Sequence, residues 1–229
     1  MSRGDNNIDI GHLELHRDEM HQRIEISMGA VICAEAELRG EFPIVIGEDC
    51  VLHPFARVEA TGGPIFLGKG NVLEEQCVLR NEGLPQGMHV GDHNLFEVRC
   101  FVENVQKMGD ANVVEVNAKL DNLAGVGSDC IFGVNIQLSG KSGSQLSSSS
   151  SVRSVVAAPP GGPATAISNV FVSDGLVFPT NAVHEPIAVP RTTGIEREDR
   201  NHLRLIQILK ETLPKYHYLK QDKDLCDVG

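Results

Sequence analysis

Large apolar residues recur at every sixth position from residue 26 to residue 138, a spacing that suits neither an α-helix nor an ordinary strand. Six rows of three such positions, here called anchors, account for this stretch. Within each row the spacing is six, and between rows it is 8, 9, 11, 6 and 6. The rows are Ile26, Ile32, Leu38; Ile46, Leu52, Val58; Leu67, Leu73, Leu79; Val90, Phe96, Val102; Met108, Val114, Leu120; and Val126, Phe132, Leu138.

Three sixes per row describe a triangular coil with three short strands and three corners, the signature of hexapeptide solenoids. The sequence therefore predicts an all-β solenoid over 24–138. It would be a left-handed parallel β-helix of hexapeptide repeats with about six or seven triangular coils, each strand turning one anchor inward. All extra residues fall at one corner, where a loop can bulge without breaking the parallel pairing. Coils stacked at the strand spacing of about 4.8 Å would make a rod roughly 29 Å long.

Other columns of the repeat support this geometry. Asn71, Asn94 and Asn112 occupy the same place in consecutive rows, where stacked amides can form a hydrogen-bonded structural ladder. Five of the six rows have glycine after the first anchor, which suits close backbone approach or a turn with positive φ. Four cysteines fall at positions where a corner needs a small residue, and we interpret them as core fillers: Cys50, Cys77, Cys100 and Cys130.

The remainder of the chain divides by composition. Residues 1–23 form a polar tail, and 139–168 are rich in Ser, Pro and Gly, which predicts a flexible insertion. Strand-like residues return in 169–190, where a last irregular coil is expected. A helix and a tail are predicted for 195–220. Leu205, Ile206, Leu209 and Leu213 make its apolar stripe, Leu203 and Ile208 widen it, and Pro214 marks its end.

Two columns on one outer face are candidates for docking. The residue before each second anchor is aliphatic in every row, and a row of exposed aliphatics this long should be covered. These residues are Val31, Val51, Val72, Leu95, Val113 and Ile131. Glu74, Glu97 and Glu115 follow the second anchor in adjacent rows, where stacked carboxylates repel unless a basic partner or a changed protonation relieves them. The cover is either the chain's own C-terminal helix or another subunit.

Charge and composition narrow the classes of partner. The net charge of −11 and a pI near 5.2 argue against binding to nucleic acid or anionic membrane. No apolar run is long enough for a transmembrane helix, and the N-terminus lacks an apolar signal core. The six cysteines are scattered without a CxxC pair, which favours reduced thiols in the cytosol.

The histidines give little support to catalysis. Enzymes with a β-helix are of two broad types. The first type uses zinc and resembles the γ-class carbonic anhydrases, which are homotrimers and need three histidine ligands for the metal. The rod carries His53, His89 and His93 in different rows and columns. The second type, the hexapeptide acyltransferases, needs a histidine base, and neither His53 nor His93 has a residue nearby to orient it. We expect no enzyme, no cofactor and no metal. A γ-carbonic-anhydrase-like hydratase and an acyltransferase stay open as alternatives.

Several segments also resemble a known family. These are IEISMGAVICAEAELRGE, VLHPFARV, GKGNVLEEQCVLRNE, GDHNLFEVRCF, KMGDANVVEVNAKL and LPKYHYLK. Together they resemble the β-helical subunits of the dynactin pointed-end complex, over about 24–138 and 203–220. The resemblance implies a non-enzymatic scaffold beside a second β-helix subunit (dynactin subunit 5), the pointed-end actin-related protein and its neighbour. It also implies an indirect link to dynein, microtubule transport and cargo docking. The location would be the cytoplasm and cytoskeleton, including the centrosome or kinetochore. The insertion at 139–168 and the long N-terminus depart from that family's pattern.

Overall fold

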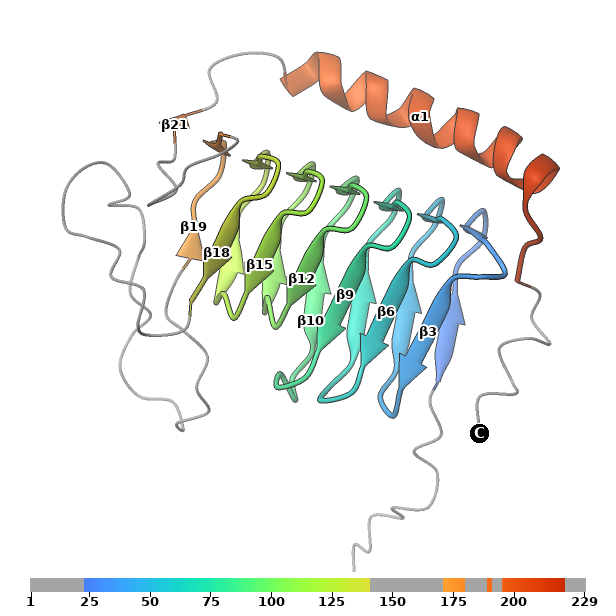
Figure 1. Cartoon of the computed structure of the whole chain (residues 1–229), viewed down its shortest axis with the longest axis horizontal. Helices are drawn as coiled ribbons and strands as arrows, with labels where there is room; N and C mark the ends of the chain where they lie inside the picture. Colours follow the sequence, from blue (N-terminus) through green and yellow to red (C-terminus); the bar gives the residue numbers. More distant parts are fainter. Residues whose placement is uncertain (1–22, 141–170, 180–188, 191–194, 221–229) are drawn as a thin grey trace, which may run out of the picture.

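Short parallel strands wind into a three-sided rod with one helix lying along it (Figure 1). The computed structural model describes residues 23–140, 171–179, 189–190 and 195–220. The predicted tail at 1–23 and insertion at 139–168 lie almost wholly outside the described residues, which touch them only at 23 and at 139–140. The described part confirms the predicted parallel solenoid of about six coils with a C-terminal helix.

Each side of the rod is one parallel sheet built from every third strand. The first sheet contains β1 (Ile24–Ile26), β4 (Ile44–Ile46), β7 (Ile65–Leu67), β10 (Met88–Val90), β13 (Lys107–Met108), β16 (Gly125–Val126) and β19 (Phe171–Val172). The second contains β2 (Val31–Ile32), β5 (Val51–Leu52), β8 (Val72–Leu73), β11 (Leu95–Phe96), β14 (Val113–Val114), β17 (Ile131–Phe132), β20 (Leu176–Phe178) and the antiparallel β21 (Val189–Pro190). The third contains β3 (Glu37–Gly40), β6 (Arg57–Ala60), β9 (Val78–Asn81), β12 (Phe101–Glu103), β15 (Lys119–Asp121) and β18 (Gln137–Ser139).

The strand register stacks the anchors directly on one another. Leu52 pairs with Leu73, Leu73 with Phe96, and Phe96 with Val114, and the other two sheets align their anchors in the same way. Every anchor is buried except Ile26, which lies in the first coil and is half-buried. The period of six therefore corresponds to one inward side chain per strand, and these side chains form a continuous core along the rod axis.

The corners explain the glycine column and the uneven spacing between rows. A Cβ on Gly47 would lie 2.4 Å from the carbonyl oxygen of Gly68 in the next coil, so close backbone approach is what requires glycine there. Positive φ falls instead on non-glycine corner residues such as Asp49, Gln76 and Asn117. The extra residues of the early rows lie between the third-sheet strands and the following first-sheet strands, as in the connection from β9 to β10.

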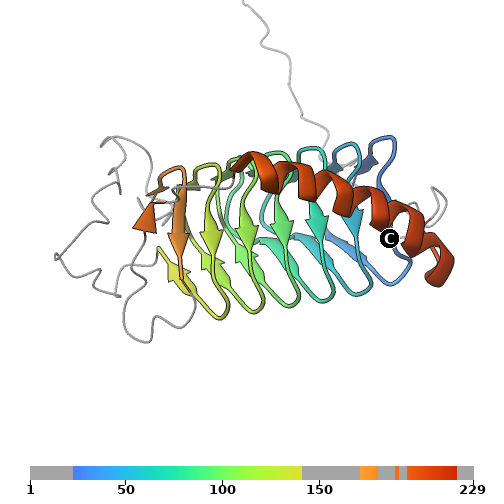
Figure 2. The same cartoon turned by 90° about the horizontal axis from the view of Figure 1, so that it is seen from above.

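The helix α1 (Ile195–Tyr216) runs obliquely along the second sheet (Figures 1 and 2). The prediction that Pro214 ends the helix is wrong, since α1 continues through Pro214 to Tyr216. Proline removes one backbone donor, and this close to the C-terminus only one hydrogen bond of the last turn is lost. Two further strands, β19 and β20, extend the first and second sheets beyond the sixth coil. No helix among the described residues is both long and apolar enough to cross a membrane.

Candidate docking face on the second sheet

The aliphatic column on the outer face of the second sheet is only partly covered. Val51 and Val72 are fully buried and Val31 is nearly so, although all three point away from the rod core. Leu95, Val113 and Ile131, farther along the same column, are half-buried. The column therefore divides into an N-terminal part that α1 covers and a C-terminal part whose aliphatic side chains are still accessible.

Contacts from α1 explain this division. Ile206 and Leu213 are buried against Val31, Val51 and Val72, with Leu209 and Leu95 packed at the margin of the cluster. Leu203 and Ile208 are 54% and 58% exposed, so the prediction that they widen the packed stripe is wrong. They lie on other sides of the helix, because the packed stripe follows the spacing of 206, 209 and 213.

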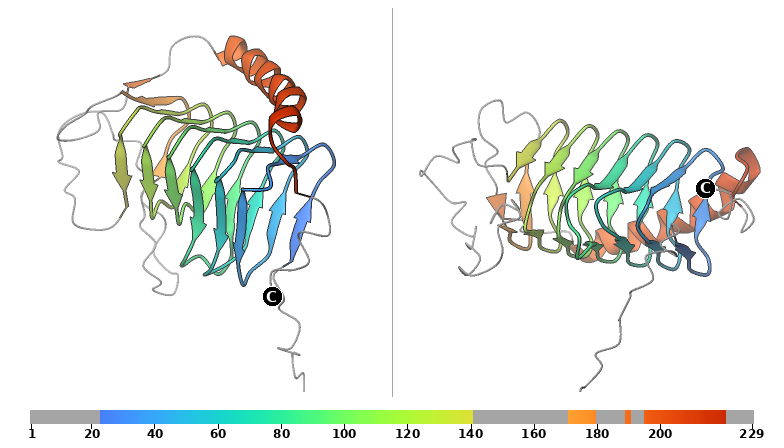
Figure 3. Two further views of the ribbon diagram at one scale, coloured as in Figure 1. Left: turned by 45° about the vertical axis from the view of Figure 1, so that its right-hand side comes forward. Right: turned by 90° about the horizontal axis from the view of Figure 1, so that it is seen from below.

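Polar contacts fix the helix on the corner between the first and second sheets. Lys210 forms an ion pair with Asp49, and His202 Nε2 lies 2.7 Å from the carbonyl oxygen of Gly70. Asp49 and Gly70, the two residues of the rod, lie at the same corner position of neighbouring coils. The axis of α1 nevertheless rises away from the sheet toward the helix N-terminus, as Figure 3 (left) shows. The apolar contacts are therefore concentrated over the first coils.

The segment after α1 closes the edge of the first coil. The backbone N–H of Ala34 donates to the carbonyl of Tyr218 at 2.7 Å, and that of Lys220 donates to Ile32 at 2.8 Å. Cys33 and Leu219 form an antiparallel bridge between these bonds. An exposed edge strand is a template for unwanted pairing, and this segment, called here the C-terminal latch (217–220), blocks the edge of β2.

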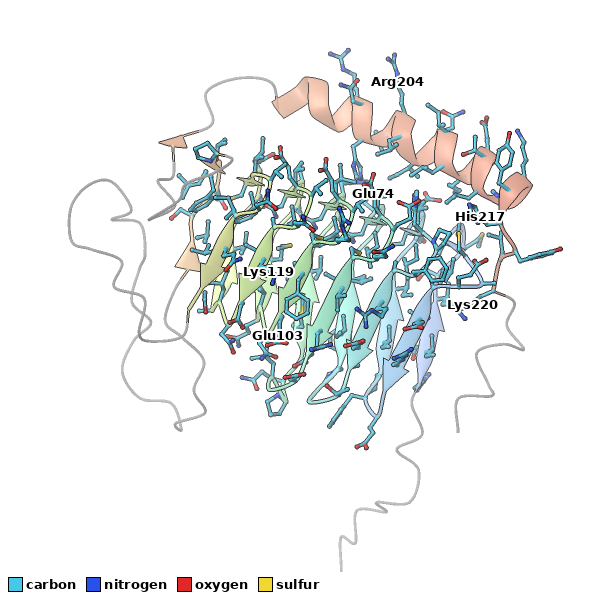
Figure 4. The ribbon with its side chains drawn as sticks, viewed as in Figure 1. Glu74, Glu103, Lys119, Arg204, His217 and Lys220 are labelled. Atoms are coloured by element: carbon cyan, nitrogen blue, oxygen red, sulfur yellow. The ribbon has the colours of Figure 1, made fainter. Side chains whose placement is uncertain are left out.

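The glutamate column accepts hydrogen bonds from the backbone, which the sequence pattern did not predict, and the expected repulsion between stacked carboxylates is present beside these bonds. The N–H groups of Val98, Val116 and Val134 donate to Glu74, Glu97 and Glu115 at 3.2, 3.1 and 2.9 Å. Each carboxylate thus accepts a bond from the next coil, so the column joins successive coils. Figure 4 labels Glu74 on the side of the rod under α1.

Partial burial changes the titration of two of these carboxyls. Burial raises the pKa of Glu74, and the adjacent charge of Glu75 acts in the same direction. Burial also raises the pKa of Glu97, with contributions from the charges of Glu74 and Glu115. The pKa of Glu75 is lowered instead. Burial acts to raise it, but the hydrogen bond from His53 and other favourable contacts outweigh burial.

Asn71, Asn94 and Asn112 form a continuous buried ladder. The Asn94 backbone N–H and side-chain Nδ2 donate to Asn71 Oδ1 at 2.9 and 3.0 Å, and Asn112 makes the same two bonds to Asn94, each at 2.9 Å. Asn112 Oδ1 then accepts the N–H of Cys130 at 2.8 Å. At this last rung a cysteine occupies the position of the asparagines, as the repeat register indicates, and its backbone takes the place of the amide donor.

The structure does not bring the histidines of the rod together. His53 follows β5 and lies 3.0 Å from Glu75 through Nδ1, so the prediction that no nearby residue orients it is wrong; its Nε2 is buried with no hydrogen-bond partner among the described residues. His89 stacks on Phe66 on the first sheet, and His93 contacts His202 edge-on at the helix corner. Within the described ranges, no group of three or more His, Cys, Asp or Glu is arranged to hold a metal ion. His16 and His21, which have the four-residue separation of a zinc-binding histidine pair in the sequence, lie outside those ranges.

Comparison with known proteins finds relatives that match part of the chain. No family model matches the chain. Dynactin subunit 6 of Caenorhabditis elegans is 44% identical over 75 residues, covering 33% of this chain and 41% of that protein. The corresponding values are 41% over 88 residues, covering 34% and 43%, for Xenopus tropicalis, and 39% over 95 residues, covering 37% and 50%, for Nematostella vectensis.

The chain resembles dynactin subunit 6. The match spans half or less of the length of each of these relatives, so the likeness to dynactin subunit 6 concerns part of the molecule. A crystal structure of a hexapeptide transferase family protein from Anaplasma phagocytophilum superposes with a TM-score of 0.54 over 84% of this chain and 92% of that one. The identity is 11%, so this second likeness shows the solenoid fold alone.

Proposed function

We propose that the chain is a non-enzymatic structural subunit of the dynactin complex. The observation that carries the proposal is the identity of 39–44% to dynactin subunit 6 from three animals, over 75–95 residues. A rod with a continuous core and a partly covered aliphatic face supports a scaffold role, because such faces serve protein–protein contact. The proposed location is a cytoplasmic, cytoskeleton-associated complex.

The finer part of the proposal assigns the place of contact. The chain lies in the pointed-end subcomplex beside dynactin subunit 5, near the actin-related protein, and supports dynein-driven transport and cargo docking. The docking face is the accessible end of the aliphatic column, which Leu95, Val113 and Ile131 form. All three are half-buried, and Glu97 and Glu115 border them. Its support is geometric, since α1 covers Val51 and Val72 and leaves this end accessible.

A structural role agrees with the arrangement of the histidines. Acyl transfer needs a base near an oriented nucleophile, and zinc hydration needs three ligands around one point. His53, His89 and His93 instead make three separate contacts, with Glu75, Phe66 and His202.

Affinity purification of the tagged full chain from cell extract tests the proposal. Mass spectrometry should recover dynactin subunits, and metal analysis of the same sample should give no stoichiometric zinc. The double variant Val113→Asp, Ile131→Asp should recover these subunits in much lower yield. Val45→Asp is the matched control, because Val45 is also half-buried and lies on the outer face of the first sheet.

Three results would contradict the proposal. A homotrimer that holds one zinc per chain, without dynactin subunits, would favour the hydratase. Thermal stabilisation by an acyl-coenzyme A would favour the acyltransferase. Equal recovery of dynactin subunits by the parent, the double variant and the Val45→Asp control would retain membership of the complex but remove the docking face.

A further inference from the structure

The outer face of the third sheet carries a cleft that neither the fold nor the proposed docking face uses. It has a volume of about 860 Å³ and extends over β3, β6, β9, β12 and β15. Its floor is apolar, because Val78 and Phe101 occupy neighbouring strands of the same column. Phe55 and Arg99 line it from the corner, and Lys119 lines it from β15. Figure 4 labels Lys119 on this sheet.

Phe55 is placed in a way that the solenoid does not need. It has a φ of 63° at a corner position that later coils fill with Gln76, Arg99, Asn117 and Asn135. Left-handed backbone suits asparagine, whereas a bulky side chain there is a strained outlier. The ring is also 56% exposed, so it contributes little to the core. The corner itself requires this φ, but the exposed aromatic ring beside a cleft favours contact with another molecule.

Most acidic groups of this face already have partners. Glu59 accepts from Arg80 Nε at 2.6 Å and lies 3.5 Å from Arg57, and Glu103 lies 3.5 Å from Arg80. Ser139 Oγ donates to Asp121 at 2.9 Å. These contacts form a row along one side of the cleft in which Glu59 and Glu103 are ion-paired, whereas Asp121 accepts a hydroxyl hydrogen bond that leaves its charge in place.

Two exposed cationic side chains of the cleft do not belong to this row of contacts. Arg99 and Lys119 are exposed, and within the part of the chain that the structure describes their side chains make no hydrogen bond or ion pair, although their backbone N–H groups bond to neighbouring coils. They lie in adjacent coils, about 4.8 Å apart along the rod at the backbone. In a chain of net charge −11, an unpaired cationic pair beside an apolar floor is a local reversal of charge.

We infer that this cleft binds a short, extended, acidic segment of a partner protein that carries one apolar side chain. The carboxylates would pair with Arg99 and Lys119, and the apolar side chain would lie against Phe55 and the floor. Phe55 and Lys119 are three coils apart, about 14 Å, which an extended chain spans in four or five residues. Recognition of acidic motifs by basic clusters is a recurring binding mode.

A fluorescence-anisotropy titration of the purified full chain tests this. The probe is a fluorescein-labelled peptide, Gly-Leu-Glu-Glu-Glu-Glu-Gly, and the comparison peptide replaces each Glu with Gln. The acidic peptide should bind at least tenfold more tightly than the Gln peptide, and its affinity should fall as salt is raised. Arg99→Glu should weaken binding about tenfold and Phe55→Ser several-fold.

The control is Lys107→Glu, which makes the same type of charge reversal at an exposed position on the first sheet and should leave the affinity unchanged. Equal loss in Arg99→Glu and Lys107→Glu would mean attraction to net charge alone and would overturn the proposal. So would equal binding of the two peptides, or no binding up to about 1 mM, the weak end of specific affinities. Displacement of the peptide by millimolar phosphate alone would reassign the cleft to a small anion. Concentration-dependent dimers lost in Phe55→Ser would reassign it to a second copy of the chain.

Discussion

The asparagine ladder makes a quantitative prediction about what joins the coils. Replacing Asn94 with alanine removes its own bond to Asn71 and both bonds that Asn112 donates to it. All three asparagines are fully buried, so the two donors of Asn112 cannot recover by bonding to water. At about 1 kcal/mol for each lost bond, plus the penalty for stranded buried donors, Asn94→Ala should lower the free energy of unfolding by roughly 3–5 kcal/mol.

Urea unfolding followed by far-UV circular dichroism, with calorimetry alongside, measures this change. For a chain of this length the predicted loss corresponds to a fall in Tm of roughly 6–20 °C. The transition should also broaden, because coils of a solenoid couple mainly to their neighbours and Asn94 lies in the middle of the rod. Early and late coils would then unfold over different ranges of denaturant.

The matched control is Gln137→Ala, which removes an amide from an exposed position on β18. It should change the unfolding free energy by about 0.5 kcal/mol or less. If Asn94→Ala and Gln137→Ala shift the transition equally, the ladder contributes no stability beyond that of a surface amide, and the reasoning from buried donors is refuted.

Three further measurements follow from the described contacts. Ile206→Ala should destabilise the chain by about 2–4 kcal/mol in urea unfolding, because Ile206 is buried between α1 and the second sheet, whereas Ile208→Ala at an exposed position should have almost no effect. The raised pKa of Glu97 means that its stabilising contribution is present below the unfolded-state pKa and is lost as the pH rises through the folded-state pKa. Glu97→Gln, which keeps an acceptor oxygen, should therefore gain stability relative to the parent as the pH rises from about 4 to 7 in urea unfolding. Burial raises the pKa of the Cys50 thiol to about 11, so iodoacetamide at about pH 8 should label it only after unfolding, as peptide mass spectrometry would detect.

The core of the rod could be predicted from the sequence because each coil repeats one local rule. The spacing of six fixes one inward residue per strand, and parallel stacking then aligns Leu52, Leu73 and Phe96 without further information. The one anchor that is only half-buried, Ile26, lies in the first coil, where β1 pairs with β4 on one side and the described residues place no strand of the same sheet on the other. A periodic pattern describes an average coil and contains no information about its ends.

The covering of the outer face could not be predicted in the same way. The apolar stripe of α1 matches the aliphatic column in character, but its register along the column depends on single contacts between distant residues. Lys210 with Asp49 and His202 with Gly70 are separated by more than a hundred positions in the chain, and nothing in the hexapeptide rhythm selects them. The same holds for Glu97, whose carboxylate accepts a backbone bond only because the coil that follows places Val116 above it.

The helix α1 and the C-terminal latch are consecutive segments of the chain, and both pack against the first coils of the rod. Ile206 and Leu213 cover Val51 and Val72, and the same chain segment continues into the pairing of Leu219 with Cys33 at the edge of β2. The buried side chains of α1 and the backbone pairing of the latch therefore attach the same end of the chain to the first coils. At the other end of the second sheet, β21 pairs with β20 in antiparallel fashion and blocks that edge. With both described edges of this sheet blocked, the proposed docking face around Val113 and Ile131 implies lateral docking rather than end-to-end stacking of this sheet.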